Sequence, residues 1–283
     1  MKILFIFSIV ILPLFAQALI NGSAAETEEY VPVVFMRTEA VEKDGSSAPS
    51  FCNATFLSDR LLITAAHCVV QSIALRKTEI IIDIGEYVYN KKNGNRIGYL
   101  VREKVTDPKA TFKVLDSVEN RLARKGVNTD LGLTDDIALI YLSTPVKVEK
   151  PVLTFAQKAS RSQAGAFISR INQYLPEIVT VNPIAEMSTS DTRRRAVLNQ
   201  VSTSGYGSNV HLESKSTARV EPGDSGAPLF MRESGKLFLV GITKGRGETF
   251  FTNWDVYTWI GDKACEIGAK LPLSNDEKGT LCH

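Results

Sequence analysis

The chain has 283 residues, of which 44% are hydrophobic and 23% are charged, so it is long and apolar enough to bury a full-sized core. Its formal net charge of +2 is too small to indicate binding to nucleic acid or to a membrane surface. The one dense basic run in the sequence is Arg193-Arg194-Arg195, which is expected in a solvated loop.

Residues 1–18 have the pattern of a secretory signal peptide. Lys2 precedes an apolar run from Ile3 to Phe15, and Ala16-Gln17-Ala18 follows it. A charged start, a short hydrophobic segment and a small-x-small ending are typical of a segment that is removed on export. A membrane anchor is the alternative, but a spanning helix needs about 20 apolar residues and this run is shorter. We therefore expect a secreted protein that starts at Leu19, extracellular or, in a bacterium, periplasmic.

All 4 cysteines follow this segment. An even number of cysteines in an exported chain predicts disulfide bonds. Pairing of neighbours, Cys52 with Cys68 and Cys265 with Cys282, is the simplest of the three possible connectivities. No Cys-x-x-Cys or His-x-x-x-His spacing indicates zinc, and we expect no metal and no cofactor. Acidic residues within 79–95 make calcium conceivable, although their spacing does not require it.

Short β-rich segments separated by turn residues run through the chain after Leu19. Many short strands with few helical repeats predict an all-β barrel or sandwich. The polar segment 43–50 contains Gly45 and Pro49 and is expected to be a loop. Apolar residues recur at helical spacing from Asp255 to Gly268, which predicts a helix near the C-terminus. The strands are expected at 31–37, 55–57, 61–64, 79–84, 96–101, 137–142, 166–171, 177–181, 196–203, 229–231, 237–242 and 250–251.

The segment Gly223-Asp224-Ser225-Gly226 places a serine between two glycines, just before an apolar run. The glycines allow the backbone to turn sharply around Ser225, so that the hydroxyl can act as a nucleophile. The N–H groups of Gly223 and Ser225 can then point at a developing oxyanion. Gly, Asp and Ser also form ordinary turns, so this segment alone does not distinguish a nucleophile from a loop.

Two other segments supply the partners that a nucleophilic serine needs. His67, one of 3 histidines, follows an apolar segment and directly precedes Cys68. Asp136 precedes four apolar residues, so its carboxylate should be buried, which is costly without a partner. Acyl transfer requires such a set, with Ser225 as nucleophile, His67 as general base and acid, and Asp136 holding the imidazole.

These motifs resemble those of the chymotrypsin-like (trypsin-fold) serine proteases, over nearly all of the chain after the signal segment. The resemblance implies an all-β fold of two six-stranded antiparallel β-barrels, roughly 19–145 and 146–255, followed by a C-terminal helix and tail. It also implies a secreted serine endopeptidase that cleaves proteins or peptides as a monomer, through a site between the barrels. The matching segments, in the family's order, are Thr64-Ala65-Ala66-His67-Cys68, Asp136-Ile137-Ala138-Leu139 and Gly223-Asp224-Ser225-Gly226-Ala227-Pro228.

The same resemblance implies a role for the start of the mature chain. Leu19-Ile20-Asn21-Gly22 is similar to the family's Ile-Val-Gly-Gly, whose free amino group turns inward to pair with the aspartate before the nucleophile. Asp224 is the matching aspartate. Our hypothesis is that removal of the signal peptide itself creates the activating amino-terminus at Leu19, with no separate propeptide.

Around the substrate pocket the chain departs from the family pattern. Glu221 replaces a cysteine whose disulfide bridges the pocket, and Ala227 replaces a glycine, which together with the few disulfides favours a bacterial-type member. Arg219, six residues before the nucleophile, replaces the aspartate at the base of the trypsin pocket. A basic pocket would favour an acidic side chain before the scissile bond, and a neutral pocket with Arg219 in solvent is the alternative. The other expected pocket residues are Val220 and the wall segment Thr243-Lys244-Gly245-Arg246.

Two other functions fit parts of the sequence. A non-catalytic family member, serving as a binding or adhesion module, usually lacks a triad residue, and this chain has all three. An esterase of the α/β-hydrolase type needs Gly-x-Ser-x-Gly and a later histidine, but Ala227 ends the motif and only His283 follows it. Asn21-Gly22-Ser23 and Asn53-Ala54-Thr55 are glycosylation sequons, meaningful only in a host that glycosylates.

Overall fold

The computed structural model describes most of the chain after the expected signal peptide. The signal peptide itself, the sequon at Asn21 and the predicted strand 250–251 lie outside the described residues. No helix in the described part of the chain is long and apolar enough to cross a membrane. The described residues are 19, 22–25, 28–30, 32–41, 47–70, 73, 78–89, 96–125, 135–148, 154–155, 164–181, 193–204, 211–248 and 253–282.

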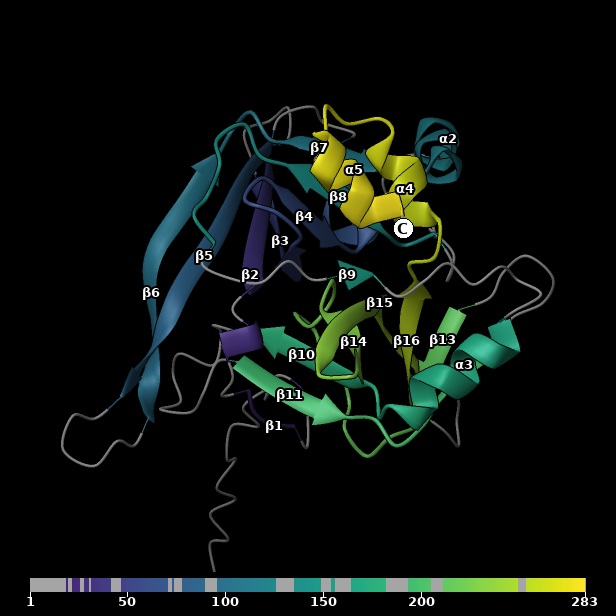
Figure 1. Ribbon diagram of the computed structural model, residues 1–283. Helices are drawn as coiled ribbons and strands as arrows, with labels where there is room; N and C mark the ends of the chain where they lie inside the picture. The colour runs from purple at the N-terminus through teal and green to yellow at the C-terminus, as the bar shows by residue number, and fades with distance from the viewer. Residues whose placement is uncertain are drawn as a thin grey trace, which may run out of the picture.

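The first half of the chain forms an antiparallel sheet with the strand order β6-β5-β2-β3-β4-β8-β7 (Figure 1). Two of these strands determine where the functional residues lie. Thr64 at the end of β4 pairs with Ala138 at the start of β8, so the segments beyond these two residues leave the sheet at the same edge. The strands are β2 (Val33–Val41), β3 (Ser47–Phe56), β4 (Leu61–Thr64), β5 (Thr78–Tyr89), β6 (Arg96–Asp107), β7 (Thr111–Val114) and β8 (Ala138–Tyr141).

The second half forms another sheet with the order β1-β11-β10-β14-β15-β16-β13-β12, and β9 lies beside β15. β1 comes from the start of the chain and crosses to this sheet, so the sheet has an additional strand at its edge. Both sheets curl, which agrees with the expected all-β fold of two barrels (Figure 1). The strands are β1 (Ser23–Ala24), β9 (Thr154–Phe155), β10 (Glu177–Val181), β11 (Arg193–Val197), β12 (Val201–Ser204), β13 (His211–Ser214), β14 (Pro228–Glu233), β15 (Lys236–Glu248) and β16 (Asn253–Trp259).

Two hydrophobic cores stabilise the sheets. Ile63 and Leu139, side by side on β4 and β8, are fully buried in the first core. Leu229 and Tyr257 belong to the second core, together with the side chain of Leu19 from the start of the chain. The cores therefore lie beneath the strand ends that lead to His67, Asp136 and Ser225.

The expected helix at 255–268 is wrong in its first part. Asn253–Trp259 is strand β16, because its β-branched and aromatic residues pair with β13 on one side and β15 on the other. The helix α4 begins only at Lys263, ends at Gly268, and packs against β7 and β8. A second short helix, α5 (Asn275–Cys282), follows it.

The expected strand at 166–171 is also wrong, because Ala164–Gln173 is helix α3. Phe167 and Ile171 are four residues apart, so they share one helix face and are both buried. The Phe167 ring stacks on the Trp259 ring with 5.0 Å between the centroids. Ser47–Ser50, expected in a loop, belong to β3. Other helical elements within the described residues are η1 (Glu28–Tyr30), η2 (Ala66–Cys68) and α2 (Asp116–Lys125).

Both disulfides join neighbouring cysteines. Cys52 on β3 is bonded to Cys68 at the end of η2, and Cys265 on α4 is bonded to Cys282 on α5. The first disulfide therefore supports the turn that carries His67, while the second closes the C-terminal helices.

Candidate active site

His67 and Asp136 meet at the edge where β4 ends and β8 begins. Nδ1 of His67 lies 2.7 Å from Oδ2 of Asp136, and the backbone N–H of His67 donates to Oδ1 at 2.8 Å. The carboxylate is completely buried, whereas 36% of the imidazole surface is exposed. Because Nδ1 is held by the carboxylate, Nε2 is the ring nitrogen left to exchange a proton with another group.

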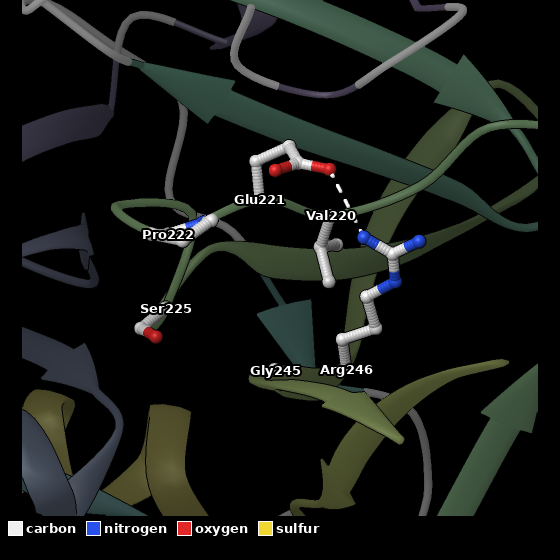
Figure 2. Close-up of a pocket in the computed structure, with 6 residues that line it drawn as sticks. All are labelled: Val220, Glu221, Pro222, Ser225, Gly245 and Arg246. Carbon is white, nitrogen blue, oxygen red and sulfur yellow. Dashed lines mark hydrogen bonds and ion pairs between the residues drawn. The ribbon is translucent and has the colours of Figure 1, made fainter. Parts of the chain in front are cut away.

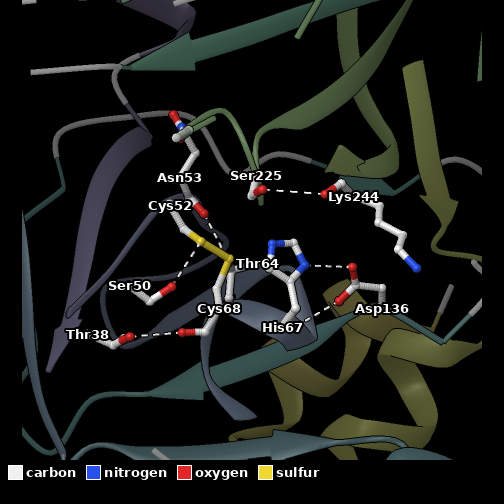
Figure 3. The surroundings of a disulfide bond; sticks show 11 residues. Thr38, Ser50, Cys52, Asn53, Thr64, His67, Cys68, Asp136, Ser225 and Lys244 are labelled. Atoms are coloured by element: carbon white, nitrogen blue, oxygen red, sulfur yellow. Dashed lines mark hydrogen bonds and ion pairs between the residues drawn. A yellow bond between two sulfur atoms is a disulfide. The ribbon is translucent and has the colours of Figure 1, made fainter. Parts of the chain in front are cut away.

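The turn η2 that carries His67 is held from two directions (Figure 3). Cys68 is joined to β3 through its disulfide with Cys52. The Thr38 hydroxyl on β2 donates to the carbonyl of Cys68 at 2.8 Å. The backbone next to the imidazole is therefore fixed to two strands of the first sheet.

The loop before β14 carries Ser225 between two residues with positive φ. Gly223 has a φ of 100° and Gly226 a φ of 81°, values that glycine adopts without steric cost. A Cβ on Gly226 would collide with the carbonyl of Asn53 and the hydroxyl of Thr64. Neither Gly223 N–H nor Ser225 N–H donates a hydrogen bond to any residue that the structure describes. Both groups remain available to an oxygen atom of a bound molecule.

Ser225 and Asp136 lie on opposite sides of the His67 ring in Figure 3. The serine hydroxyl donates to the carbonyl of Lys244, at a long 3.4 Å, rather than to the imidazole. Catalytic hydrogen bonds often tighten only when substrate is bound, so this orientation does not exclude Ser225 as a nucleophile.

A comparison with family models gives the same assignment as the motifs. The trypsin family model matches residues 20–260, which cover most of the chain. The chain belongs to the trypsin family. This is a family of serine endopeptidases, so the protein is a trypsin-like serine protease that acts on proteins or peptides. A comparison with curated proteins found no match.

Leu19 of this trypsin-family chain is buried in the second core. Its backbone N–H donates to Oδ2 of Asp224 at 2.9 Å, although 205 residues separate the two. Asp224 is completely buried. Burial raises the pKa of this carboxyl to about 7, an effect that the N–H groups of Glu221 and Leu19 partly oppose. The structure thus brings together the two residues that the sequence motifs link.

The segment after Leu19 is held by the basic run, which is not in a solvated loop as expected. Arg193–Arg195 begin strand β11, and Arg193 is 1% exposed. Ser23 and Ala24 pair with β11, and the N–H of Ala25 donates to the carbonyl of Arg193 at 3.0 Å. The Arg194 guanidinium donates to the carbonyl of Gly22. This strand therefore fixes residues 22–25 against the second sheet.

A cavity of about 410 Å³ lies beside Ser225 (Figure 2). Of the expected pocket residues, Val220, Gly245 and Arg246 lie on it. Arg219 is not among the lining residues, and its Nη1 donates instead to the carbonyl of Ala218 at 2.9 Å. The carbonyl of Thr243 accepts from the N–H of Gly226, and the carbonyl of Lys244 accepts from the hydroxyl of Ser225. The lining residues are Val220, Glu221, Pro222, Ser225, Gly245 and Arg246.

The cation that lines the cavity is Arg246, at the end of the expected wall segment, and not Arg219. Its Nη1 lies 3.3 Å from Oε1 of Glu221, and Figure 2 shows this ion pair joining the loop before Ser225 to β15. Glu221 is the residue that replaces the family's pocket cysteine. An ion pair thus connects two segments that line the cavity.

Asp255, expected as the first residue of a helix, is a buried acid. It is opposite Arg246 in the pairing of β15 with β16, and its Oδ1 accepts from the N–H of Val220 at 3.3 Å. Burial raises the pKa of the Asp255 carboxyl to about 6. Its two neighbours both line the cavity, so this carboxyl contributes to the charge behind the cavity wall. An acid within the apolar sequence Trp254 to Trp259 was the signal that could have identified it.

Cys52, His67 and Cys68 form a cluster of potential metal ligands within the described residues. Both sulfurs are joined in a disulfide, so neither can act as the thiolate that a metal requires. The side chains of the acidic segment 79–95, where calcium was conceivable, lie outside the described part.

Proposed function

We propose that the protease acts through Ser225 as nucleophile, His67 as general base and acid, and Asp136 as the partner of the imidazole. The N–H groups of Gly223 and Ser225 would bind the oxyanion. The observation that carries this proposal is the buried Asp136 carboxylate, 2.7 Å from Nδ1 of His67, with Ser225 on the other side of the ring. This arrangement leaves Nε2 of the imidazole to take the serine proton.

In the first half of the reaction, Oγ of Ser225 attacks the substrate carbonyl carbon while Nε2 of His67 takes the hydroxyl proton. The carbonyl oxygen becomes an oxyanion and accepts hydrogen bonds from the two free N–H groups. Asp136 stabilises the imidazolium that forms. The carbon–nitrogen bond then breaks as His67 transfers its proton to the leaving amine, which leaves an acyl group on Ser225.

In the second half, water attacks the acyl group and transfers a proton to Nε2 of His67. The second tetrahedral intermediate uses the same two N–H groups. Its collapse releases the carboxylic acid product and returns the proton to Oγ of Ser225. No metal or cofactor enters either half.

We propose further that residues 1–18 direct secretion and that their removal frees the amino group of Leu19. An α-ammonium at this nitrogen would lie 2.9 Å from a buried carboxylate, where an opposite charge is strongly favourable. Asp224 also accepts from the N–H of Glu221, at the start of the loop that carries Ser225. The new ion pair would therefore stabilise that loop in the conformation that binds the oxyanion.

The proposed preference for an acidic side chain before the scissile bond now depends mainly on Arg246. Arg246 lines the cavity beside Ser225, whereas Arg219 does not. An acidic substrate side chain would replace Glu221 as the partner of this guanidinium. Asp255 behind the wall opposes such a substrate when it is ionised, so we expect the preference to be modest.

The decisive experiment is cleavage of a diverse peptide library by the protein that begins at Leu19, in parallel with Ser225→Ala. Cleavage by the first protein and not by the second would support Ser225 as nucleophile, and the cut positions would define the preferred side chain. Two folded but inactive proteins would instead favour a non-catalytic binding module or a further activation step.

A further inference from the structure

Asn53 on β3 connects the two sheets next to the proposed oxyanion site (Figure 3). It is completely buried. Its backbone N–H donates to the carbonyl of Ser225 at 2.6 Å, and its Nδ2 donates to the carbonyl of Gly223 at 2.8 Å. Its Oδ1 accepts from the N–H of Val181 on β10 at 2.6 Å. Its carbonyl accepts from the hydroxyl of Thr64, at the end of the strand that leads to His67, at 2.6 Å.

Asn53 therefore holds the carbonyls of the two residues whose N–H groups are free. The Gly223 carbonyl belongs to the peptide unit that joins residues 223 and 224, and the Ser225 carbonyl to the unit that joins residues 225 and 226. Hydrogen bonds at these carbonyls fix the peptide units that adjoin those carrying the N–H groups of Gly223 and Ser225, and so limit how far these N–H groups can turn. Gly223 needs this restriction, because its φ of 100° is one of many backbone conformations open to glycine. The side-chain amide of Asn53 opposes rotation at Gly223, and its backbone opposes rotation at Ser225.

We propose that Asn53 is a positioning residue, which fixes the direction of the two oxyanion-binding N–H groups from the opposite sheet. This inference rests on the proposed function, because it assigns Asn53 to the same reaction. Displacement of a reacting or binding group by about 1 Å can reduce a rate by about 100-fold. The sequon reading of Asn53-Ala54-Thr55 does not compete with this role, since the amide nitrogen that would carry a glycan is bonded inside the folded protein.

The chain offers a matched control in Asn172 on α3. Asn172 likewise uses its side chain to bond a backbone, donating to the carbonyl of Val201 at 2.8 Å and accepting from its N–H at 2.7 Å. Asn172→Ala and Asn53→Ala thus each remove two side-chain hydrogen bonds to backbone groups. The Asn172 bonds join α3 to β12, and neither Asn172 nor Val201 is one of the proposed active-site residues.

We expect Asn53→Ala to lower kcat about 10- to 100-fold with little change in KM, because the donors act mainly in the transition state. Asn172→Ala should change kcat less than twofold. Binding of a peptide aldehyde, which forms a tetrahedral adduct with Ser225, should weaken in parallel with kcat. Binding of the corresponding peptide alcohol, which forms no adduct, should not change. A residue with a purely structural role would not separate these two ligands.

A second variant, Asn53→Asp, covers the case in which Asn53→Ala does not fold. It keeps the shape and an acceptor for Val181 N–H, but it loses the donor to the Gly223 carbonyl, so the same fall in kcat is expected. Equal kcat in the Asn53 and Asn172 variants would overturn the proposal, and so would failure of both Asn53 variants to fold while Asn172→Ala folds. An inactive wild-type protein would instead contradict the proposed function itself.

Discussion

The backbone nitrogen of Leu19 lies 2.9 Å from Oδ2 of Asp224, inside the core of the second sheet. In the uncleaved chain this nitrogen is an uncharged amide, and burial raises the pKa of Asp224 to about 7. The pKa of Asp224 is thus higher in the folded protein than in the unfolded chain. The contribution of Asp224 to folding stability is therefore fully present below the unfolded pKa and is lost as pH rises towards 7. A free ammonium at Leu19 would lower the pKa of Asp224 in the folded protein, so much less stability would be lost as pH rises.

The measurement is the melting temperature of the chain that begins at Leu19 and of one with residues before Leu19 retained, between pH 5 and pH 8. We expect the cleaved form to gain stability relative to the uncleaved form as pH rises through this range. Asp224→Asn should abolish the pH dependence of the difference. A difference that does not vary with pH in the unsubstituted pair would contradict the proposed ion pair.

Asp136→Asn tests the role of the buried carboxylate. The amide retains the shape of the side chain but favours the wrong imidazole tautomer, so kcat should fall by about 10³- to 10⁴-fold. The neighbouring Asp135 is bonded to Ser117 and Arg121 instead, so Asp135→Asn should leave kcat within about twofold. Steady-state kinetics on a peptide ester and a peptide amide measure both. Comparable losses in the two variants would argue against Asp136.

Gly226→Ala tests the close approach of the Ser225 loop to the first sheet. The new Cβ would collide with Asn53 and Thr64 at a positive φ, so we expect a loss in unfolding free energy of about 3 kcal/mol or more. Gly235→Ala is the control, because its φ is also positive, at 76°, but no atom lies within 4 Å of the added carbon. It should cost only about 1–2 kcal/mol. Urea unfolding measures both losses of unfolding free energy. Equal losses in the two variants would mean that the Ser225 loop can move away from the first sheet.

The two disulfides form a matched pair for separating stability from activity. They join cysteines 16 and 17 residues apart, so the loss of either should cost a similar amount, about 3 kcal/mol. Replacement of Cys52 and Cys68 by alanine should also lower the activity of the folded protein, because this disulfide supports η2 and His67. Replacement of Cys265 and Cys282 should not. Specific activity per folded molecule, measured well below the melting temperature, distinguishes the two variants.

Arg246→Gln tests the charge of the cavity. We expect kcat/KM for substrates with Glu before the scissile bond to fall about tenfold, with little change for neutral substrates. Its partly exposed ion pair with Glu221 should contribute less than about 1 kcal/mol to stability. Arg219→Gln should have the smaller effect on selectivity, since Arg219 does not line the cavity. A larger effect of Arg219→Gln than of Arg246→Gln on selectivity would assign the preference for an acidic side chain to Arg219 instead.

The sequence predicted the fold class and indicated the residues of the proposed triad, because acyl transfer allows only certain residue types at these positions. His67, Asp136 and Ser225 are each weak signals alone, and their order along the chain made them specific. Periodicity was less reliable, because short apolar runs fit both strand and helix. Residues 166–171 were expected as a strand but form a helix, and Asp255–Trp259 were expected as a helix but form a strand.

The role of Asn53, and the choice of Arg246 over Arg219 as the lining cation, depend on contacts between distant segments, so the sequence did not establish them. Asn53 is 170 residues from Gly223 in sequence, and its immediate neighbours suggested only a glycosylation motif. Arg246 lines the cavity, whereas the guanidinium of Arg219 donates to the Ala218 carbonyl. Such an orientation of one side chain has no sequence signature.

The buried nitrogen of Leu19 also decides how the enzyme can be produced. A purification tag joined directly ahead of Leu19 would keep the nitrogen as an amide, so under the proposed activation such a fusion would need a processing step that leaves leucine first. At the other end, α5 lies on the outside of the first sheet and is anchored by the bond between Cys265 and Cys282 (Figure 1). A tag appended there would leave the nitrogen of Leu19 unaltered.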